Sequence, residues 1–356
     1  MARRIAQNLP TGSRRYRRLE TCATNCALHF GGFGFRIRIV NLRFLFLVVL
    51  PLWVSGAPLF TNAPVHHGAI GAGEGPAWHA DGYLLFTGGG KITKRDADGN
   101  VSVFREDAGG ANGLLFDREG RLVVCEAARR RVTRTERDGT ITVLADNYRG
   151  SRFNTPNDLT IDSRGRIYFS DPRYGSRANM EMRDENGRIT EGVYRVDAPG
   201  KVTRIIAHEV ERPNGILVGP GDKHLYVADN NNNTVRGARK LWRFDLRGDG
   251  SISPRSRKLI YDWKNARGPD GLKMDGQNRL YVAAGLNVPN PPYETADALR
   301  AGVYVLSSGG KLLDFIAIPN DEVTNCAFGG ADRQTLFVTA GGHLWSVRAG
   351  GSARTR

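Results

Sequence analysis

The fold of this 356-residue chain is decided by one stretch, Asn154-Thr155-Pro156-Asn157-Asp158-Leu159-Thr160-Ile161-Asp162-Ser163-Arg164-Gly165-Arg166-Ile167-Tyr168-Phe169-Ser170-Asp171. Polar, turn-forming residues lead into a short apolar strand, and the chain turns at Ser163-Arg164-Gly165. A second strand then returns and ends in a carboxylate, so the stretch is predicted to form a β-hairpin.

The same pattern recurs five more times, and each hairpin opens with one amide or carboxylate side chain. These six anchor residues are Glu74, Asn112, Asn157, Asn214, Asp270 and Asn325. They lie 38, 45, 57, 56 and 55 residues apart. A multi-stranded unit of this length, repeated along a chain, is typical of a propeller blade.

Each of the first five repeats carries a second hairpin, such as the one that turns at Asp98-Gly99, which gives four strands per blade. The sixth repeat ends after His343-Leu344-Trp345-Ser346-Val347 and lacks its fourth strand. We expect the segment before Glu74 to supply that strand and close the ring. The sequence therefore predicts an all-β, six-bladed β-propeller with four-stranded blades.

The first 57 residues differ in composition from the rest of the chain. They hold nine Arg, no Lys and one acid, Glu20, so about eight of the fifteen net positive charges lie there. An apolar run, Phe44-Leu45-Phe46-Leu47-Val48-Val49-Leu50-Pro51-Leu52-Trp53-Val54, is followed by the small residues Ser55-Gly56-Ala57. This order predicts a secretory signal, and hence a periplasmic or secreted protein, with an uncleaved N-terminal anchor as the alternative.

The domain organisation follows from that boundary. Residues 1–57 are predicted to be a leader, 58–350 the propeller and 351–356 a short tail. A nucleic-acid-binding arm is disfavoured because no aromatic residues or known motif interleave with the arginines. We expect neither a nucleic-acid partner nor stable membrane insertion after signal removal. The sequence does not determine the oligomeric state.

The six anchors form a chemically specific set. If each begins the innermost strand of its blade, all six surround one mouth of the central channel. Their carboxylate and amide oxygens, with no sulfur, suit a hard cation such as Ca²⁺, with Mg²⁺ or Mn²⁺ as substitutes. Any single Asn-Gly or Asp-Gly could be a mere turn former, but six in register favour a site.

Long loops are expected to return to the same mouth, since they follow the second strand of later repeats. They span Pro172 to Arg188, Asn230 to Arg239, and Leu286 to Leu299. Long loops over a ring of oxygen donors are typical of a substrate entrance.

The chain resembles the senescence marker protein (regucalcin) and gluconolactonase family of six-bladed calcium propellers. The matching motifs are Glu74-Gly75-Pro76-Ala77-Trp78, Pro156-Asn157-Asp158, Ser170-Asp171-Pro172 with Tyr174-Gly175, Arg212-Pro213-Asn214-Gly215, Gly268-Pro269-Asp270-Gly271, and Asn325-Cys326-Ala327-Phe328-Gly329-Gly330. The resemblance implies that Glu74, Asn214 and Asp270 hold the metal, with Asn157 beside it. It also implies hydrolysis of a small-molecule sugar lactone.

Within that resemblance, the cation would polarise the lactone carbonyl, and Asp270 is the carboxylate best placed to take a proton from water. Whether Asp270 acts as ligand, base or both stays open. Asn157, Tyr174 and Asn325 are expected to contact substrate. One departure is Thr155, where animal members carry Arg, and Arg173, Arg177 and Tyr174 are candidate replacements.

Three alternatives come from other functional classes. A phosphotriesterase-like hydrolase would use the same metal ring, so only assays on both ester types separate the two. A strictosidine-synthase-like condensing enzyme shares the propeller but needs no metal, and the intact set of Glu74, Asn214 and Asp270 argues against it. A non-catalytic binding propeller is the third, because fold alone does not determine function.

Overall fold

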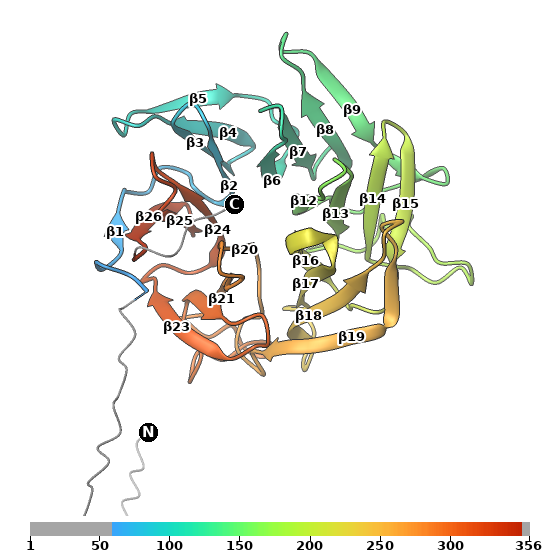
Figure 1. Ribbon diagram of the computed structural model, residues 1–356. Coiled ribbons are helices and arrows are strands. Elements are labelled where there is room, and N and C mark those ends of the chain that lie inside the picture. Colours follow the sequence, from blue (N-terminus) through green and yellow to red (C-terminus); the bar gives the residue numbers. More distant parts are fainter. Residues whose placement is uncertain (1–58, 351–356) are drawn as a thin grey trace, which may run out of the picture. The chain divides into compact units, whose positions relative to one another are not determined.

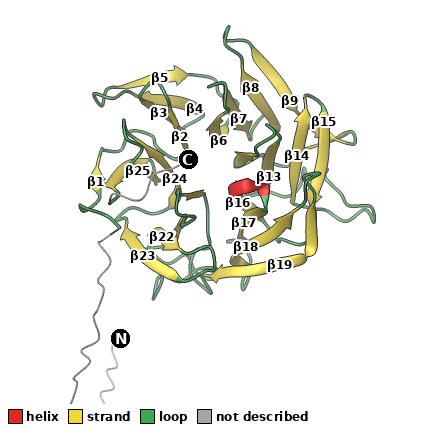
Figure 2. Ribbon diagram, in the orientation of Figure 1, coloured by secondary structure: helices red, strands yellow, loops and turns green. Residues whose placement is uncertain are grey.

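The computed structural model describes residues 59–350, which form six antiparallel β-sheets of four strands each, arranged as blades around a central channel (Figure 1). The predicted Arg-rich leader and signal segment, and the tail after Gly350, lie outside the described residues. Strands and loops dominate, and η1 (Pro220–Asp222) is a single turn of 3₁₀-helix (Figure 2). Within residues 59–350, no helix has the length and apolar character needed to cross a membrane.

The strands follow one another outward from the channel in each of the first five blades. Blade 1 contains β2 (Glu74–His79), β3 (Tyr83–Gly88), β4 (Lys91–Arg95) and β5 (Val101–Arg105), and blade 2 contains β6 (Ala111–Phe116), β7 (Leu122–Glu126), β8 (Arg131–Thr135) and β9 (Ile141–Ala145). Blade 3 contains β12 (Leu159–Ile161), β13 (Ile167–Asp171), β14 (Gly192–Ala198) and β15 (Lys201–Ile206), and blade 4 contains β16 (Pro213–Val218), β17 (His224–Asn230), β18 (Arg239–Leu246) and β19 (Ile252–Asp262). Blade 5 contains β20 (Leu272–Met274), β21 (Leu280–Ala284), β22 (Gly302–Leu306) and β23 (Leu312–Ala317). A short ribbon of β10 (Asn147–Tyr148) and β11 (Ser151–Arg152) joins blades 2 and 3.

The sixth blade closes the ring with strands from both ends of the described chain. It contains β24 (Val323–Gly329), β25 (Thr335–Ala340) and β26 (His343–Arg348), and its outermost strand is β1 (Val65–His66). Val65 pairs with Ser346, and His66 pairs with Trp345. The predicted six-bladed propeller is therefore confirmed, as is its closure by the segment before Glu74.

Each pair of neighbouring blades buries its own apolar interface. Between blades 2 and 3, for example, Val123 and Cys125 pack in one cluster with Leu159, Phe169 and Tyr194. A chain of this length exceeds what one central core supports, and a ring of separate interfaces solves that problem.

A repeated aspartate–arginine turn closes three of the inner hairpins at the mouth where the innermost strands end. In Asp162–Arg166, one carboxylate oxygen accepts the backbone N–H groups of Arg164 and Arg166, and the other accepts Arg166 Nε at 2.6 Å. Asp117–Arg121 and Asp275–Arg279 repeat this arrangement. The turn carboxylates at that mouth are thus neutralised by arginines of their own hairpins.

Candidate functional site

The six anchor residues all lie at or beside the start of an innermost strand. Glu74 begins β2, Asn112 and Asn214 are the second residues of β6 and β16, and Asn325 is the third residue of β24. Asn157 and Asp270 come two residues before β12 and β20. Because the six innermost strands run in the same direction from these points, the anchors belong to one mouth of the channel, which we call the anchor mouth.

Glycines directly after the anchors let neighbouring blades meet backbone to backbone. A Cβ atom on Gly215 would lie 2.1 Å from the carbonyl oxygen of Asp270, and one on Gly271 would lie 2.0 Å from the side chain of Asn325. Real Cβ contacts are not this short, so a side chain at either position would force the anchors apart. From the sequence, each such glycine taken alone could be a turn former; the structure adds that Gly215 and Gly271 set the spacing between anchors of adjacent blades.

The acidic anchors lie in a buried, electrically unbalanced cluster. Asp270 is 3 % exposed, and its Oδ2 accepts Arg267 Nη2 at 2.9 Å. Burial raises the pKa of Asp270 above its usual range, although Arg267 opposes the shift. Burial also raises the pKa of Glu74, and the charge of Asp270 raises it further. A third carboxylate, Asp158, is 3 % exposed, and its negative charge also raises the pKa values of Glu74 and Asp270.

The amide of Asn325 presents its nitrogen, not its oxygen, to Glu74. Its Oδ1 accepts Lys273 Nζ at 3.3 Å and the backbone N–H of Cys326 at 2.9 Å. Lysine and a backbone N–H can only donate, so the orientation is fixed, and Nδ2 donates to Glu74 Oε2 at 3.3 Å. Asn325 therefore orients Glu74 and has no oxygen left for a cation.

The amide of Asn214 has the opposite arrangement. Its Nδ2 donates to the hydroxyl of Tyr174 at 2.9 Å, and its buried Oδ1 has no donor among the described residues. The Oδ1 of Asn112 and the Oδ2 of Asp158 are likewise buried without a hydrogen-bond donor in this part of the chain. Asn157 is 8 % exposed, and its side chain makes no hydrogen bond in the described structure.

The first long loop, between β13 and β14, is fixed to blade 4 through Glu191. This carboxylate accepts the backbone N–H of Arg173 at 2.7 Å, a guanidinium N–H of Arg177, and Nε of Arg212 at 2.9 Å. The Arg212 guanidinium lies over the ring of Tyr174, 5.3 Å from its centroid. Arg177 is thus engaged inside the loop, and Tyr174 is held between Arg212 and Asn214.

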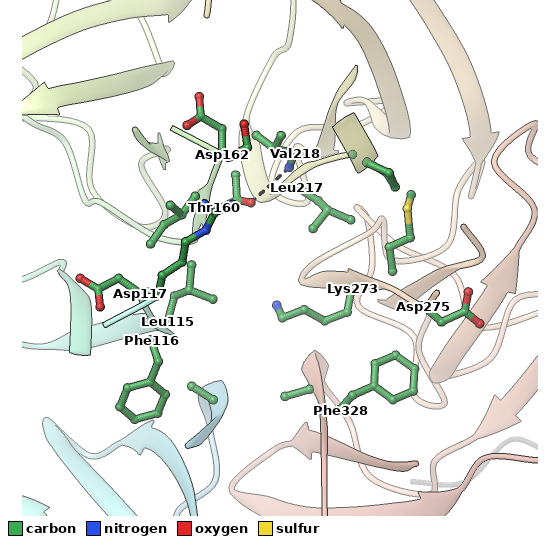
Figure 3. A pocket seen from close by; sticks show the side chains of 18 of the residues that line it. Leu115, Phe116, Asp117, Thr160, Asp162, Leu217, Val218, Lys273, Asp275 and Phe328 are labelled. Carbon is green, nitrogen blue, oxygen red and sulfur yellow. Dashed lines mark hydrogen bonds between the residues drawn. The ribbon is translucent and has the colours of Figure 1, made fainter. Parts of the chain in front are cut away.

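A cavity of about 630 Å³ is lined by none of the anchors. It opens at the opposite mouth, where the innermost strands end, and Thr160, Leu217 and Phe328 line it (Figure 3). A hydrogen bond from the backbone N–H of Val218 to Thr160 Oγ1, 3.1 Å long, joins two of its walls. Lys273 points into the channel here and connects this cavity to the anchors through Asn325.

A second cavity, of about 570 Å³, lies on the side of the anchor mouth. Thr155, two residues before Asn157, lines it together with Arg130, Arg152 and Arg173. Glu181, which also lines it, pairs with Arg130 and Arg152. Arg173 makes no ion pair within residues 59–350, so this cavity carries excess positive charge.

Comparison with known proteins places this geometry in a family. The model of the SMP-30/Gluconolactonase/LRE-like region matches residues 72–342, which include blades 1 to 5 and the two inner strands of blade 6. The chain belongs to this family. A gluconolactonase of Zymomonas mobilis is 30 % identical to it over 77 % of this chain and 78 % of its own.

Two solved structures share the fold of this chain. A gluconolactonase from Xanthomonas campestris has 30 % identity and a TM-score of 0.63, with 82 % of this chain and 88 % of that chain covered. The calcium-binding protein regucalcin from Agrobacterium tumefaciens has 18 % identity and a TM-score of 0.60, covering 83 % and 96 %, and so shares the fold.

The residues present at the anchor mouth fit a hard divalent cation. Three buried oxygens, on Asn112, Asp158 and Asn214, lack hydrogen-bond donors in the described structure. Four carboxylates, on Glu74, Asp158, Asp270 and Glu322, outnumber the nearby cations Arg267 and Lys273. No cluster of three or more His, Cys, Asp or Glu side chains suited to a metal occurs within residues 59–350, so the fit depends on amide oxygens.

Three residues at this mouth were missed by the sequence analysis: Asp158, Arg267 and Lys273. Asp158 takes the position that glycine holds in four of the other repeats, and this departure from the repeat could have identified it. Arg267 and Lys273 lie three residues before and three after Asp270. No repeat or motif marks them, because their importance depends on which side chains of blade 6 and of the loops they meet.

Proposed function

We propose that this protein is a divalent-cation-dependent lactonase that hydrolyses a sugar lactone of the aldonolactone class. The single observation that carries the proposal is the buried pair of carboxylates Glu74 and Asp270, which repel each other and share the anchor mouth with the orphaned oxygen of Asn214. The names of its relatives support the reaction class, since gluconolactonases are 30 % identical to it in both comparisons.

Calcium is the cation that we propose, held by Glu74, Asn214 and Asp270, with Asn157 beside them. All four supply oxygen atoms of the type that Ca²⁺ prefers, and Mg²⁺ or Mn²⁺ could substitute. When bound, such a cation supplies Lewis-acid polarisation of the lactone carbonyl. Asn325 contributes indirectly, because it holds Glu74 Oε2 and leaves Oε1 for the site.

Asp270 is the proposed base. Its Oδ2 is held by Arg267, which leaves the two lone pairs of Oδ1, one to contact the cation and one to accept a proton from the attacking water. Burial gives the carboxylate a higher proton affinity than a surface aspartate has, and this suits proton abstraction near neutral pH. Water adds to the carbonyl carbon, the ring C–O bond breaks, and the proton passes to the departing alkoxide to give a hydroxy acid.

The lactone is proposed to enter from the anchor mouth, over Asn157 and Thr155. Thr155 cannot replace the family's arginine, because its hydroxyl donates to the carbonyl of Pro172 at 2.5 Å. Arg173 lines the same cavity without an ion-pair partner in the described structure, so we assign it to the polar substituents of the substrate. Export of the protein by the signal-like segment within residues 1–57 is also part of the proposal.

The decisive experiment is a metal-titrated screen of the full chain. Chelator-treated protein, verified to be metal-free, is assayed on aldonolactones and on a phosphotriester, with and without Ca²⁺, Mg²⁺ or Mn²⁺. We expect lactone hydrolysis that is lost in chelator and restored by calcium. Full activity of the metal-free protein would overturn cation dependence, and hydrolysis of the phosphotriester alone would favour the phosphotriesterase alternative.

A further inference from the structure

The Tyr174 hydroxyl connects the first long loop to the anchor Asn214. It accepts the Nδ2–H of Asn214 at 2.9 Å and donates to the backbone carbonyl of Asn230 at 3.2 Å. Both neighbours are buried, Asn214 at 3 % and Asn230 at 0 % exposure. The hydroxyl is therefore enclosed by protein partners on both its donor and its acceptor side.

The direction of these two bonds follows from elementary donor and acceptor rules. A backbone carbonyl can only accept, so the single hydrogen of the Tyr174 hydroxyl is committed to Asn230. The hydroxyl can then only accept from Asn214, which forces the amide to turn its nitrogen toward Tyr174. If the amide were reversed, the single Tyr174 hydrogen could serve only one of the two oxygens. The Asn230 carbonyl also accepts the backbone N–H of Asn232 at 3.0 Å, so reversal would cost it one of its two hydrogen bonds.

The consequence is that Asn214 Oδ1 faces away from Tyr174, where no protein donor among residues 59–350 reaches it. We infer that Tyr174 is a positioning residue that locks the Asn214 amide with its oxygen presented to a divalent cation. This inference rests on the proposed function. It assigns Tyr174 a role that acts through Asn214, in place of direct contact with substrate.

The surroundings of Tyr174 keep it in that position. Arg212 covers its ring at 5.3 Å, and Glu191 holds Arg212 through Nε at 2.9 Å. Glu191 also accepts the backbone N–H of Arg173, next to Tyr174 in the chain, at 2.7 Å. Tyr174 is thus held by Arg212, which stacks on its ring, and by Glu191, which binds the backbone of the preceding residue. The position of its hydroxyl therefore does not depend on a bound cation.

The test is calcium binding to chelator-treated full-length protein, measured by titration calorimetry. Tyr174→Phe keeps the ring but removes the hydroxyl, and it should weaken calcium binding about 10–100-fold, the usual effect of losing a partner that orients a metal ligand. Tyr304→Phe is the matched control, because it also removes a hydroxyl that donates to a carbonyl, that of Arg300 at 2.7 Å, but on the third strand of blade 5. Its calcium affinity should stay within about twofold of the unsubstituted protein.

Asn214→Asp tests whether Tyr174 acts through the orientation of the Asn214 amide. Both ends of a carboxylate are oxygens, so an aspartate presents an oxygen to the cation in either orientation. In that background, adding Tyr174→Phe should change the calcium affinity less than about threefold. Thermal unfolding of each metal-free variant verifies that it is folded. An equal loss in both backgrounds, or an unchanged affinity in Tyr174→Phe alone, would overturn the inference and leave the proposed function intact. Lack of calcium binding by the unsubstituted protein would overturn both.

Discussion

Replacing Gly215 with alanine tests whether the spacing between adjacent anchors is needed for function. The added Cβ would lie 2.1 Å from the carbonyl oxygen of Asp270 and 2.9 Å from Cα of Gly271. These atoms belong to the backbone of the next blade and cannot rotate away. Because Gly215 does not have a positive φ, alanine suits its local conformation, and any effect comes from the collision.

The magnitude follows from the distance. Ordinary contact begins at 3.4 Å, so the backbones of blades 4 and 5 must separate by about 1.3 Å at the residue that we propose as the base. Insertion of one methyl group into a close-packed contact typically costs about 1–3 kcal/mol. A displacement of about 1 Å at a catalytic group can lower the rate about 10²-fold. Gly215→Ala should therefore reduce lactone turnover about 100-fold with a modest loss of stability.

The assay combines urea unfolding with lactone hydrolysis followed by acid release. Gly248→Ala is the control, since an added Cβ there meets no atom within 4 Å and φ is not positive. It should leave both the free energy of unfolding and the rate nearly unchanged. If Gly215→Ala behaved like Gly248→Ala in both measurements, the argument that glycine sets the anchor spacing would be wrong.

Four further predictions concern the site and the domain. Asp270→Asn should stay nearly inactive at saturating calcium, about 10²–10⁴-fold below the unsubstituted protein, because proton abstraction is lost; recovery in excess calcium would make Asp270 a ligand only. Asn157→Ala should lower lactone hydrolysis by a large factor with little change in unfolding, while Asn112→Ala should be milder, and equal small effects would show that these anchors are structural. Burial raises the pKa of Asp171 from 3.8 to about 8, so the folded state binds more protons and the protein should lose stability as the pH rises between those values, by up to about 1.4 kcal/mol per pH unit from this group. The free energy of unfolding of Asp171→Asn, measured in urea from pH 5 to 8, should lack this pH-dependent contribution. The same pH dependence in the variant and the unsubstituted protein would contradict the prediction. Deletion of residues 1–57 should leave a protein that unfolds cooperatively in a thermal melt, and loss of that transition would refute the predicted domain boundary.

Much of the fold could be predicted from the sequence because its determinants are local. Strand alternation and dipeptide turns repeat six times, and each repeat specifies two hairpins from residues close together in the chain. The missing strand in the last repeat predicted that the segment before Glu74 would close the ring, and the pairing of Val65 with Ser346 confirms it. The innermost position of the anchors follows from the same repetition.

The chemistry of the anchor mouth depended on contacts that repetition does not contain. Asn214 and Asn325 occupy equivalent positions, yet one turns its oxygen and the other its nitrogen toward the site, because Tyr174 accepts from the first and Lys273 donates to the second. Tyr174 comes from a loop of blade 3, and Lys273 from the innermost strand of blade 5.

The sequence by itself thus determined the number of blades, their strands and the ring of oxygen-bearing side chains, since a periodic pattern of apolar and turn residues acts over a few neighbours. Only the tertiary structure decided which of those oxygens are left without donors, and that a cavity of about 630 Å³ opens at the mouth without anchors. The physical reason is that hydrogen-bond direction and charge balance depend on side chains from different repeats, such as Tyr174 with Asn214 and Asn325 with Glu74, which meet only when separate blades pack side by side.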